Sequence, residues 1–210
     1  MNHTDAIVLD TSIFTNPEVA RVFGDDATAA VNRFVELARE AAPRLTCYMP
    51  PSVMDELTHF ADPERLPPDL ELVVHLQAPR RHDLRVPGLF LYELIEDIRT
   101  RIDRGLRVAE KAVREVESGS VERTVRWLRG HYREALRTGL LDSTEDLDVI
   151  LLAVELGAAV TSADRGLMQW AEKGGLRLMP AERLHGLMVH LAGGSGDGGD
   201  SRTIRKDGAE

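Results

Sequence analysis

The segment from residue 142 to residue 164 constrains the fold more than any other part of the chain. It contains a group of acids, then an apolar run, then a second short apolar run that ends in an acid. Ser143 followed three residues later by Asp146 resembles a capping box, and Gly157 is the residue type usually found just past a helix end. The segment is therefore predicted to form a helix followed by a strand over residues 159–161.

Three acidic side chains are expected to meet at one end of this unit. Asp142 and Asp146 are four residues apart, so they lie near one another at the start of the helix. Asp164 follows the strand, and Thr161 and Ser162 before it are candidates to orient a water or a metal ligand. Packing of the helix on the strand would bring the three carboxylates together.

The first apolar run of the chain, residues 6–9, repeats the second half of this arrangement and ends in Asp10. In open α/β sheets, functional groups gather beyond the carboxyl ends of the strands, so Asp10 and Asp164 are predicted to share one crevice. Neighbouring carboxylates repel one another unless a cation lies between them, and oxygen ligands suit Mg²⁺ or Mn²⁺. The sequence therefore predicts a divalent-metal site.

Each of these acids also has a structural explanation. Asp and Ser are favoured at helix N-termini, and Asp is common where strands run into loops. Two strands that each end in Asp, with an acidic pair one turn apart on a helix, are harder to attribute to these preferences together.

Three stretches of the chain, taken in order, resemble a known family. They are IVLDTSIFTNP near the N-terminus, PPSVMDEL from Pro50, and DSTEDLDVILLAVELGAAVTSAD up to Asp164, with a long insertion before the last. The stretches look like those of a PIN-domain ribonuclease, and their order is similar to that of the RNA-free, protein-only ribonuclease P of the Aquifex type. The resemblance covers about residues 5–192.

The resemblance implies an α/β, PIN-like fold with a central parallel sheet flanked by helices and an inserted two-helix hairpin. It implies an endoribonuclease that removes the 5′ leader from precursor tRNA by Mg²⁺-dependent hydrolysis, and a large homo-oligomer, a dodecamer. In PIN domains a Glu in the helix after the second strand joins the metal cluster, and Glu56 matches that position. An acid in the first turns of a helix is also favoured by the helix dipole, so this match has a structural alternative.

The expected mechanism is metal-assisted hydrolysis without a covalent intermediate. One or two bound ions lower the pKa of a water, orient it on the scissile phosphate and stabilise the leaving oxygen. Asp148 is a weaker candidate, because its position on the helix differs from that of Asp146 by about 200°. The catalytic candidates are Asp10, Asp142, Asp146, Asp164 and Asp148, and the metal-binding candidates are Asp10, Asp142, Asp146, Asp164 and Glu56.

Length and composition are compatible with one domain that carries an excursion, since 210 residues with 43% hydrophobic content can bury a core. Cys47 is the single cysteine, which excludes an intramolecular disulfide framework and a cysteine zinc site. No membrane segment or targeting signal is recognised, so a cytoplasmic protein is expected. The predicted parts are a nuclease domain of residues 1–87 and 141–192, a helical hairpin of 88–140 and a flexible tail of 193–210.

Hydrophobic periodicity predicts the remaining elements of the nuclease domain. A helix buries Val31, Phe34, Val35 and Ala38, which follow the spacing of a single helix face. Pro50 and Pro51 end a strand, and Ser52 is expected to cap the helix that carries Glu56. Strands are predicted at 45–49, 70–76 and 176–179, and helices at 165–173 and 181–191.

The insertion is predicted to be a pair of long helices. Apolar residues recur every three or four positions from Leu91 to Val116, and a second stripe runs from Val121 to Ala135. The two stripes are expected to pair as a helical hairpin, with one apolar edge left over for self-association.

The net charge of −9 argues against a nucleic-acid partner, but the insertion differs from the rest of the chain. Residues 99–137 hold eleven lysines and arginines against six acids, a net charge of +5. Arginine forks match phosphate oxygens, so an arginine face here is predicted to contact tRNA. The alternative is a solvated helix face that Glu122 and Glu134 partly neutralise. The arginines in question are Arg123, Arg126, Arg129, Arg133 and Arg137.

Other classes of protein stay open at this point. Asp10-Thr11-Ser12 after a strand is similar to the nucleophile motif of haloacid-dehalogenase phosphatases, but that family has a second Asp where this chain has Ser12. A toxin-type PIN ribonuclease of other RNA specificity is nearer, and the long basic insertion separates the two. A non-catalytic scaffold would use the acids as helix caps and the helical arm to bind a partner.

Overall fold

A parallel sheet forms the centre of the protein. The computed structural model describes residues 5–42, 44–116, 120–137, 141 and 143–193. Within this part of the chain the sheet has four strands in the order β3-β2-β1-β4, and all of its neighbouring pairs are parallel. The strands are β1 (Asp5–Leu9), β2 (Leu45–Met49), β3 (Val74–Leu76) and β4 (Ala159–Thr161).

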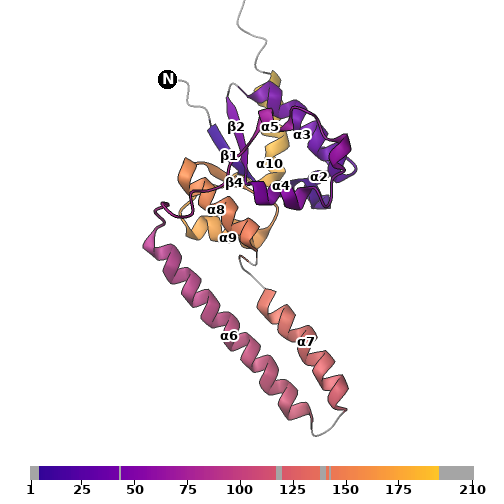
Figure 1. Ribbon diagram of the computed structural model, residues 1–210, viewed down its shortest axis with the longest axis vertical. Helices are drawn as coiled ribbons and strands as arrows, with labels where there is room; N and C mark the ends of the chain where they lie inside the picture. Colours follow the sequence, from indigo (N-terminus) through magenta and orange to yellow (C-terminus); the bar gives the residue numbers. More distant parts are fainter. Residues whose placement is uncertain (1–4, 43, 117–119, 138–140, 142, 194–210) are drawn as a thin grey trace, which may run out of the picture.

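Helices cover both faces of the sheet, which explains why its central strand reads as an unbroken apolar run. Ile7, Val8 and Leu9 of β1 are almost completely buried. Figure 1 shows α3 and α10 on one side of the sheet and α8 and α9 on the other. The helices of this body are α1 (Ser12–Thr15), α2 (Pro17–Ala20), α3 (Ala27–Ala41), α4 (Pro51–Leu57), α5 (Leu70–Val73), α8 (Thr144–Leu156), α9 (Arg165–Lys173) and α10 (Ala181–Gly193), with a 3₁₀ turn at Pro63–Arg65.

Helix α8 and strand β4 form the predicted helix and strand unit. The hydroxyl of Ser143 accepts a hydrogen bond of 3.0 Å from the backbone N–H of Asp146, so Ser143 caps the helix as expected. Gly157 ends it in the left-handed conformation, at a φ of 61°. Because α8 leads into β4 and packs against β1 and α4, its first turn lies toward the carboxyl edge of the sheet.

Several elements of the body follow the sequence pattern closely. Helix α3 buries Val31, Phe34, Val35 and Ala38 as predicted, and α9 has the predicted bounds. Helix α10 extends beyond the predicted end to Gly193. No helix in the described ranges has both the length and the apolar character required to cross a membrane.

Other predictions of local structure are corrected. The apolar run 70–76 is not one strand: Leu70–Val73 form the short helix α5, and the strand begins only at Val74. Leu72 is exposed there, so the run follows a helical turn in which Leu70 alone is buried. Residues 176–179 form only an isolated bridge, between Val160 and Leu178.

Helices α6 (Gly88–Val116) and α7 (Val121–Arg137) pack against each other as an arm that projects from the body (Figure 1). The arm is attached at the first turns of α6. Phe90 is buried with its ring edge-on to Trp170 at 5.4 Å, and Glu93 forms an ion pair of 2.7 Å with Lys173. Both partners belong to α9, so the root of the arm is fixed to a helix of the nuclease body.

The arm differs from the prediction in which surfaces its helices bury. Gly105 lies against the ring of Tyr132, where an added Cβ would be 2.8 Å from the nearest ring carbon, and Ala112 is buried. These positions lie on one flank of the predicted stripe of α6. Much of the stripe itself is therefore solvent-exposed, at Leu91, Ile95, Ile98, Ile102, Leu106 and Val113.

Candidate active site

The Asp10 carboxylate lies directly after β1 and is held by hydroxyl groups. Its residue is 6% exposed, and Oδ2 accepts a hydrogen bond of 2.6 Å from Ser162 Oγ. The hydroxyl and the backbone N–H of Ser12 also donate to Oδ2, the latter over 3.3 Å. Both serine hydroxyls therefore bind the same oxygen of Asp10.

Register explains why these side chains meet. Leu9 of β1 is paired with Thr161 of β4, so the residues that follow each strand leave the sheet side by side. The hydroxyl of Ser12 accepts from the backbone N–H of Ala163 over 2.8 Å. The hydroxyl of Ser162 likewise accepts from the N–H of Asp164 over 2.8 Å. The ends of the two strands are thus joined by one hydrogen-bond network.

Asp164 is both an exposed acid and a helix cap. Its Oδ1 accepts a hydrogen bond of 2.8 Å from the N–H of Leu167, which makes it the N-cap of α9. Helix capping, the structural alternative to metal binding, is therefore correct for one oxygen of Asp164. A single capping bond does not occupy the whole carboxylate, so the same residue can also serve a ligand at this edge.

Glu56 is connected to the same edge through Thr11. Thr11 Oγ1 donates a hydrogen bond of 2.6 Å to Glu56 Oε2, which joins the end of β1 to α4. Ser52 does not cap this helix as predicted, because α4 begins at Pro51 with Pro50 as its N-cap residue. Glu56 itself is exposed.

The remaining predicted acids lie on or next to α8. Asp146 is half-buried in the first turn of the helix, and Asp142 lies outside the described residues. Within the described ranges, no group of three or more His, Cys, Asp or Glu is arranged so that it could hold a metal ion. The predicted convergence of three acids therefore stays a prediction. Asp10 and Asp164 already have hydroxyl and backbone partners that set their positions.

The donor chemistry of this edge nevertheless suits a hard divalent cation. All of the candidate ligands are carboxylate oxygens, which Mg²⁺ and Mn²⁺ prefer. In the described part of the chain, the hydrogen bonds to the Asp10 side chain come from Ser12 and Ser162 and end on Oδ2. The hydroxyls thus fix the carboxylate from one side and leave Oδ1 for a ligand, as outer-shell partners do around metal sites.

Asp148 has a different environment from the other acids. The residue is 3% exposed, and its carboxylate accepts from Arg81 Nε over 3.0 Å and from Arg81 Nη2 over 2.5 Å. Ser52 Oγ adds a third hydrogen bond of 2.7 Å. Hydrogen bonding to Asp148, together with its negative charge, raises the pKa of Arg81 further above its ordinary value.

Sequence reasoning missed Ser12 and Arg81 as parts of this region and described the role of Ser162 only in general terms. The signal for the serines is present, since each hydroxyl lies two residues from an acid, in Asp10-Thr11-Ser12 and in Ser162-Ala163-Asp164. Thr161, the other suggested hydroxyl, is buried and its Oγ1 has no hydrogen-bond partner among the described residues.

The predicted RNA-binding arginines lie on the arm. Arg123, Arg126, Arg129 and Arg133 of α7 are exposed, and the side chain of Arg137 lies outside the described residues.

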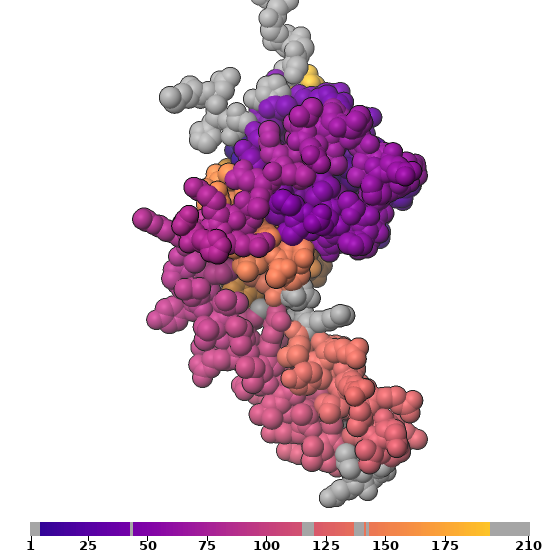
Figure 2. Space-filling model, viewed as in Figure 1, coloured from indigo at the N-terminus to yellow at the C-terminus, as the bar shows by residue number. Residues whose placement is uncertain are grey.

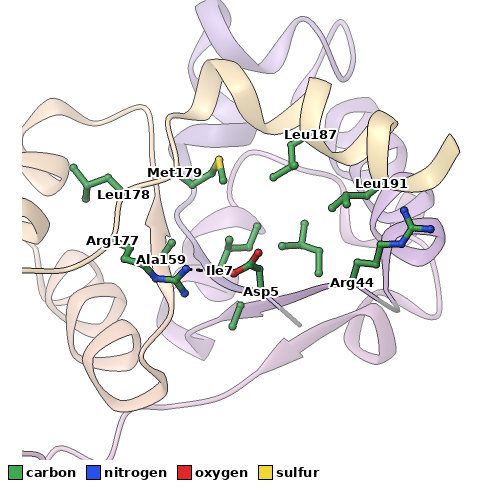
Figure 3. A pocket seen from close by; sticks show the side chains of 11 residues that line it. Asp5, Ile7, Arg44, Ala159, Arg177, Leu178, Met179, Leu187 and Leu191 are labelled. Atoms are coloured by element: carbon green, nitrogen blue, oxygen red, sulfur yellow. Dashed lines mark hydrogen bonds and ion pairs between the residues drawn. The ribbon is translucent and has the colours of Figure 1, made fainter. Parts of the chain in front are cut away.

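A cavity of about 560 Å³ lies at the opposite edge of the sheet (Figure 3). It is lined by the first residues of β1, β2 and β4, and Arg177 on its rim forms an ion pair of 3.3 Å with Asp5. The candidate acids follow the carboxyl ends of the strands, so this cavity is separate from the candidate active site.

Comparison with known proteins agrees with the fold. The family model described as PINc domain ribonuclease matches residues 6–192. An RNA-free ribonuclease P of Thermococcus onnurineus is 47% identical over 193 residues, which cover 91% of this chain and 97% of the relative. Proteins of the same name from Halorhodospira halophila and Thermodesulfovibrio yellowstonii are 43% and 40% identical, and each alignment covers 89% of this chain and at least 90% of the relative.

These matches extend through the body and the inserted arm alike. The chain therefore belongs to the PINc domain ribonuclease family, within the group of RNA-free ribonuclease P proteins.

Proposed function

We propose that this protein is a protein-only ribonuclease P that removes the 5′ leader from precursor tRNA by hydrolysis of one phosphodiester bond. The observation that carries the proposal is the near full-length match to relatives of that name, which includes the α6–α7 arm as well as the nuclease body. Processing of tRNA would place the enzyme in the cytoplasm.

Mg²⁺, or Mn²⁺ in its place, is the proposed cofactor. Asp10, Asp146 and Asp164 would hold it together with Asp142, with Glu56 as a further candidate. A bound divalent ion lowers the pKa of a water and stabilises negative charge on the leaving oxygen.

The serines next to the acids have a defined part in this proposal. Ser12 and Ser162 hold the Asp10 carboxylate in one orientation through Oδ2, and Oδ1 is the oxygen proposed to bind the ion. Asp164 is fixed by its capping bond to α9. Preorganised carboxylates need little rearrangement when a ligand binds, which favours tight and correctly oriented binding.

The arginines of α7 are proposed to bind the RNA backbone. Arg123, Arg126, Arg129 and Arg133 are exposed on α7, which belongs to the arm that projects from the body (Figure 1). A guanidinium group binds phosphate oxygens by paired hydrogen bonds and reads no base, which suits recognition of the shape of a tRNA at a distance from the cleavage site.

The arm is also the proposed surface for a homo-oligomer. On α6, Ile95 and Ile102 are 55% and 61% exposed, and Tyr132 of α7 lines a shared hollow with Ala109 and Leu128. A contiguous apolar surface of this kind marks a protein interface, and a second copy of the same arm is self-complementary to it.

Light scattering tests the assembly. Ile95→Glu together with Ile102→Glu should reduce the molar mass in solution. Leu72→Glu, which changes an exposed leucine of the body, serves as the matched control and should leave the mass unchanged. A wild-type protein that is already monomeric would disprove this part of the proposal.

Cleavage of a 5′-labelled precursor tRNA in Mg²⁺ tests the activity itself. Wild-type protein should give a single cut at the mature 5′ end, and both Asp146→Asn and addition of a chelator should abolish it. Scattered cleavage would instead indicate a PIN ribonuclease of other specificity. Intact RNA would favour a non-catalytic scaffold.

A further inference from the structure

Arg81 and Asp148 form an ion pair that the proposed hydrolysis does not use. The carboxylate belongs to α8 and is buried, with a side-chain exposure of 5%. Both of its oxygens accept hydrogen bonds from Arg81, and Ser52 binds one of them as well. A buried carboxylate with this set of partners is neutralised by the protein itself, so it has no need of a metal ion.

The guanidinium on the other side of the pair is open to solvent. The Arg81 side chain is 60% exposed although both of its bonds to Asp148 are in place. Asp148 binds the edge formed by Nε and Nη2, and a guanidinium has five N–H donors in all. The donors on Nη1 therefore point away from the buried carboxylate, in a direction that the ion pair fixes.

Arg81 lies at the same edge of the sheet as the candidate acids. It follows β3 in residues 77–87, the connector that leads to α6. It therefore lies beyond the carboxyl end of a strand, as Asp10 and Asp164 do. Its anchor Asp148 is two residues after Asp146, and Ser52 is in the same helix as Glu56. Figure 2 shows the connector in purple to magenta at the surface, between the body and the arm.

A second pair in the connector repeats the arrangement. Arg80 is 72% exposed, and its Nε donates over 2.7 Å to Glu155, whose side chain is 6% exposed. Glu155 lies seven residues after Asp148, two turns along the same face of α8. Two neighbouring arginines thus present charge to solvent while buried acids of one helix hold them.

We propose that Arg81 binds a backbone phosphate of the substrate RNA beside the scissile bond, and that Asp148 is the positioning residue that orients Arg81 rather than a metal ligand. The inference rests on the proposed ribonuclease activity. A free arginine loses rotamer freedom when it binds a phosphate, whereas one already held in a bidentate pair loses less. The contact favours RNA of any sequence, because it involves no base edge.

The test compares variants by the kinetics of precursor tRNA cleavage and by Mn²⁺ titration. Arg81→Ala alone leaves a buried unpaired acid, so the Arg81→Ala/Asp148→Asn double variant is included to remove both charges at once, and each variant is checked by thermal unfolding. The matched control is Arg39→Ala/Asp69→Asn. It removes another pair in which Nε and Nη2 of an exposed arginine both donate to an aspartate, here to the single oxygen Oδ2, and the arginine lies on α3.

Arg81→Ala and the Arg81→Ala/Asp148→Asn double variant should raise KM about tenfold with a smaller effect on kcat. The KM of Arg81→Lys should lie between theirs and that of wild type. In the inactive Asp146→Asn background, RNA binding should lose about 0.7 to 0.9 from its slope of log affinity against log salt, the value for one phosphate contact. Mn²⁺ titration should be unchanged by Asp148→Asn and weakened by Asp146→Asn. The control pair should change none of these quantities.

The outcomes separate this inference from the proposed function. An unchanged KM and salt slope in the Arg81 variants, with normal cleavage by wild type, would overturn the inference alone. Loss of Mn²⁺ binding in Asp148→Asn would also overturn it, since Asp148 would then be a ligand. If wild type does not cut precursor tRNA, the proposed function is wrong, and the salt slopes still decide whether Arg81 contacts RNA.

Discussion

Ser162 donates a hydrogen bond of 2.6 Å to Oδ2 of Asp10, although the two residues are 152 positions apart in the chain. Since this hydroxyl orients the carboxylate without being a strong ligand itself, Ser162→Ala should lower Mn²⁺ affinity or kcat by about 10- to 100-fold. Ser162→Thr keeps the hydroxyl and should recover part of the loss. Isothermal titration with Mn²⁺ and single-turnover cleavage measure the two effects, and full activity of the alanine variant would contradict the proposed role.

Asp164 caps α9 and also carries a charge that is proposed to bind the metal ion. Two substitutions separate these two roles. Asn caps helices as well as Asp does, so Asp164→Asn should keep the stability of the protein and lose cleavage activity. Asp164→Ala should lose both, with a decrease of about 1 kcal/mol in the free energy of unfolding.

Asp26 provides the control for this pair. It caps α3 through a hydrogen bond of 2.7 Å from the N–H of Ala29. Asp26→Ala should destabilise the protein to a similar extent and leave cleavage intact. Urea unfolding and cleavage assays measure both properties, and an active Asp164→Asn variant would remove this acid from the metal site.

Two glycines of the arm should respond differently to alanine. Gly130 has open space around its Cβ position, so Gly130→Ala should stabilise α7 by roughly 0.8 to 1 kcal/mol. At Gly105 the new methyl would meet the Tyr132 ring at 2.8 Å, so the same gain should be absent. Adding Tyr132→Ala to Gly105→Ala should restore the helix-propensity gain. A double-mutant cycle by urea unfolding measures the coupling, and strict additivity would show that the ring does not obstruct the site.

The arginine face should act through charge. Arg129→Ala with Arg133→Ala should weaken RNA binding and lower the salt slope by about 0.7 to 0.9 per lost contact. Arg33→Ala, an exposed arginine of α3 that is paired with Glu36, is the matched control and should leave the slope unchanged. Filter binding of the inactive Asp146→Asn protein at several salt concentrations gives the slopes. Equal slopes for the α7 variant and wild type would refute the phosphate contacts.

The connector should make stability depend on acid pH. The backbone N–H of Arg80 lowers the pKa of Glu155 below its ordinary value of 4.5, and the Arg80 side chain adds to this. In the unfolded chain Glu155 takes up a proton at higher pH than in the folded protein, so its contribution is present above about pH 4.5 and is lost as the pH falls below it. Glu155→Gln should therefore flatten the decrease in stability between pH 5 and pH 3, as urea unfolding would show. An equally steep decrease in the Glu155→Gln variant and in wild type would show that other acids cause the loss of stability.

The sequence predicted the sheet and its principal helices because their signals are local or periodic. Ser143 and Gly157 mark the two ends of α8 within one segment, and the face of α3 repeats with the helical period. The hydrogen-bond network around Asp10 could not be predicted from the sequence in the same way. It depends on the register between β1 and β4, and no local pattern states which hydroxyl will lie opposite which acid.

Two features of the structure depend on partners that the sequence does not indicate. Closeness to Asp146 in sequence makes Asp148 a weaker catalytic candidate, and no local pattern predicts that its ion-pair partner is Arg81, 67 residues away. The apolar stripe of α6 was expected to face α7, yet the close approach of Gly105 to Tyr132 lets α7 pack on the flank of that stripe. Periodicity shows that a helix has an apolar face but not which surface covers it.

Helix α6 runs without interruption for 29 residues, from its root at Phe90 on Trp170 to the end of the arm. At 1.5 Å per residue this is a rod of roughly 43 Å, and each residue added to it would turn everything beyond by about 100°. The number of residues in α6 therefore sets the direction in which α7 and its arginines face relative to the acids. Arg101 of α6 still donates a hydrogen bond of 3.4 Å to the backbone of Leu141. A single insertion between Arg101 and Gly105 would lie beyond this contact and would point the arginine face in another direction.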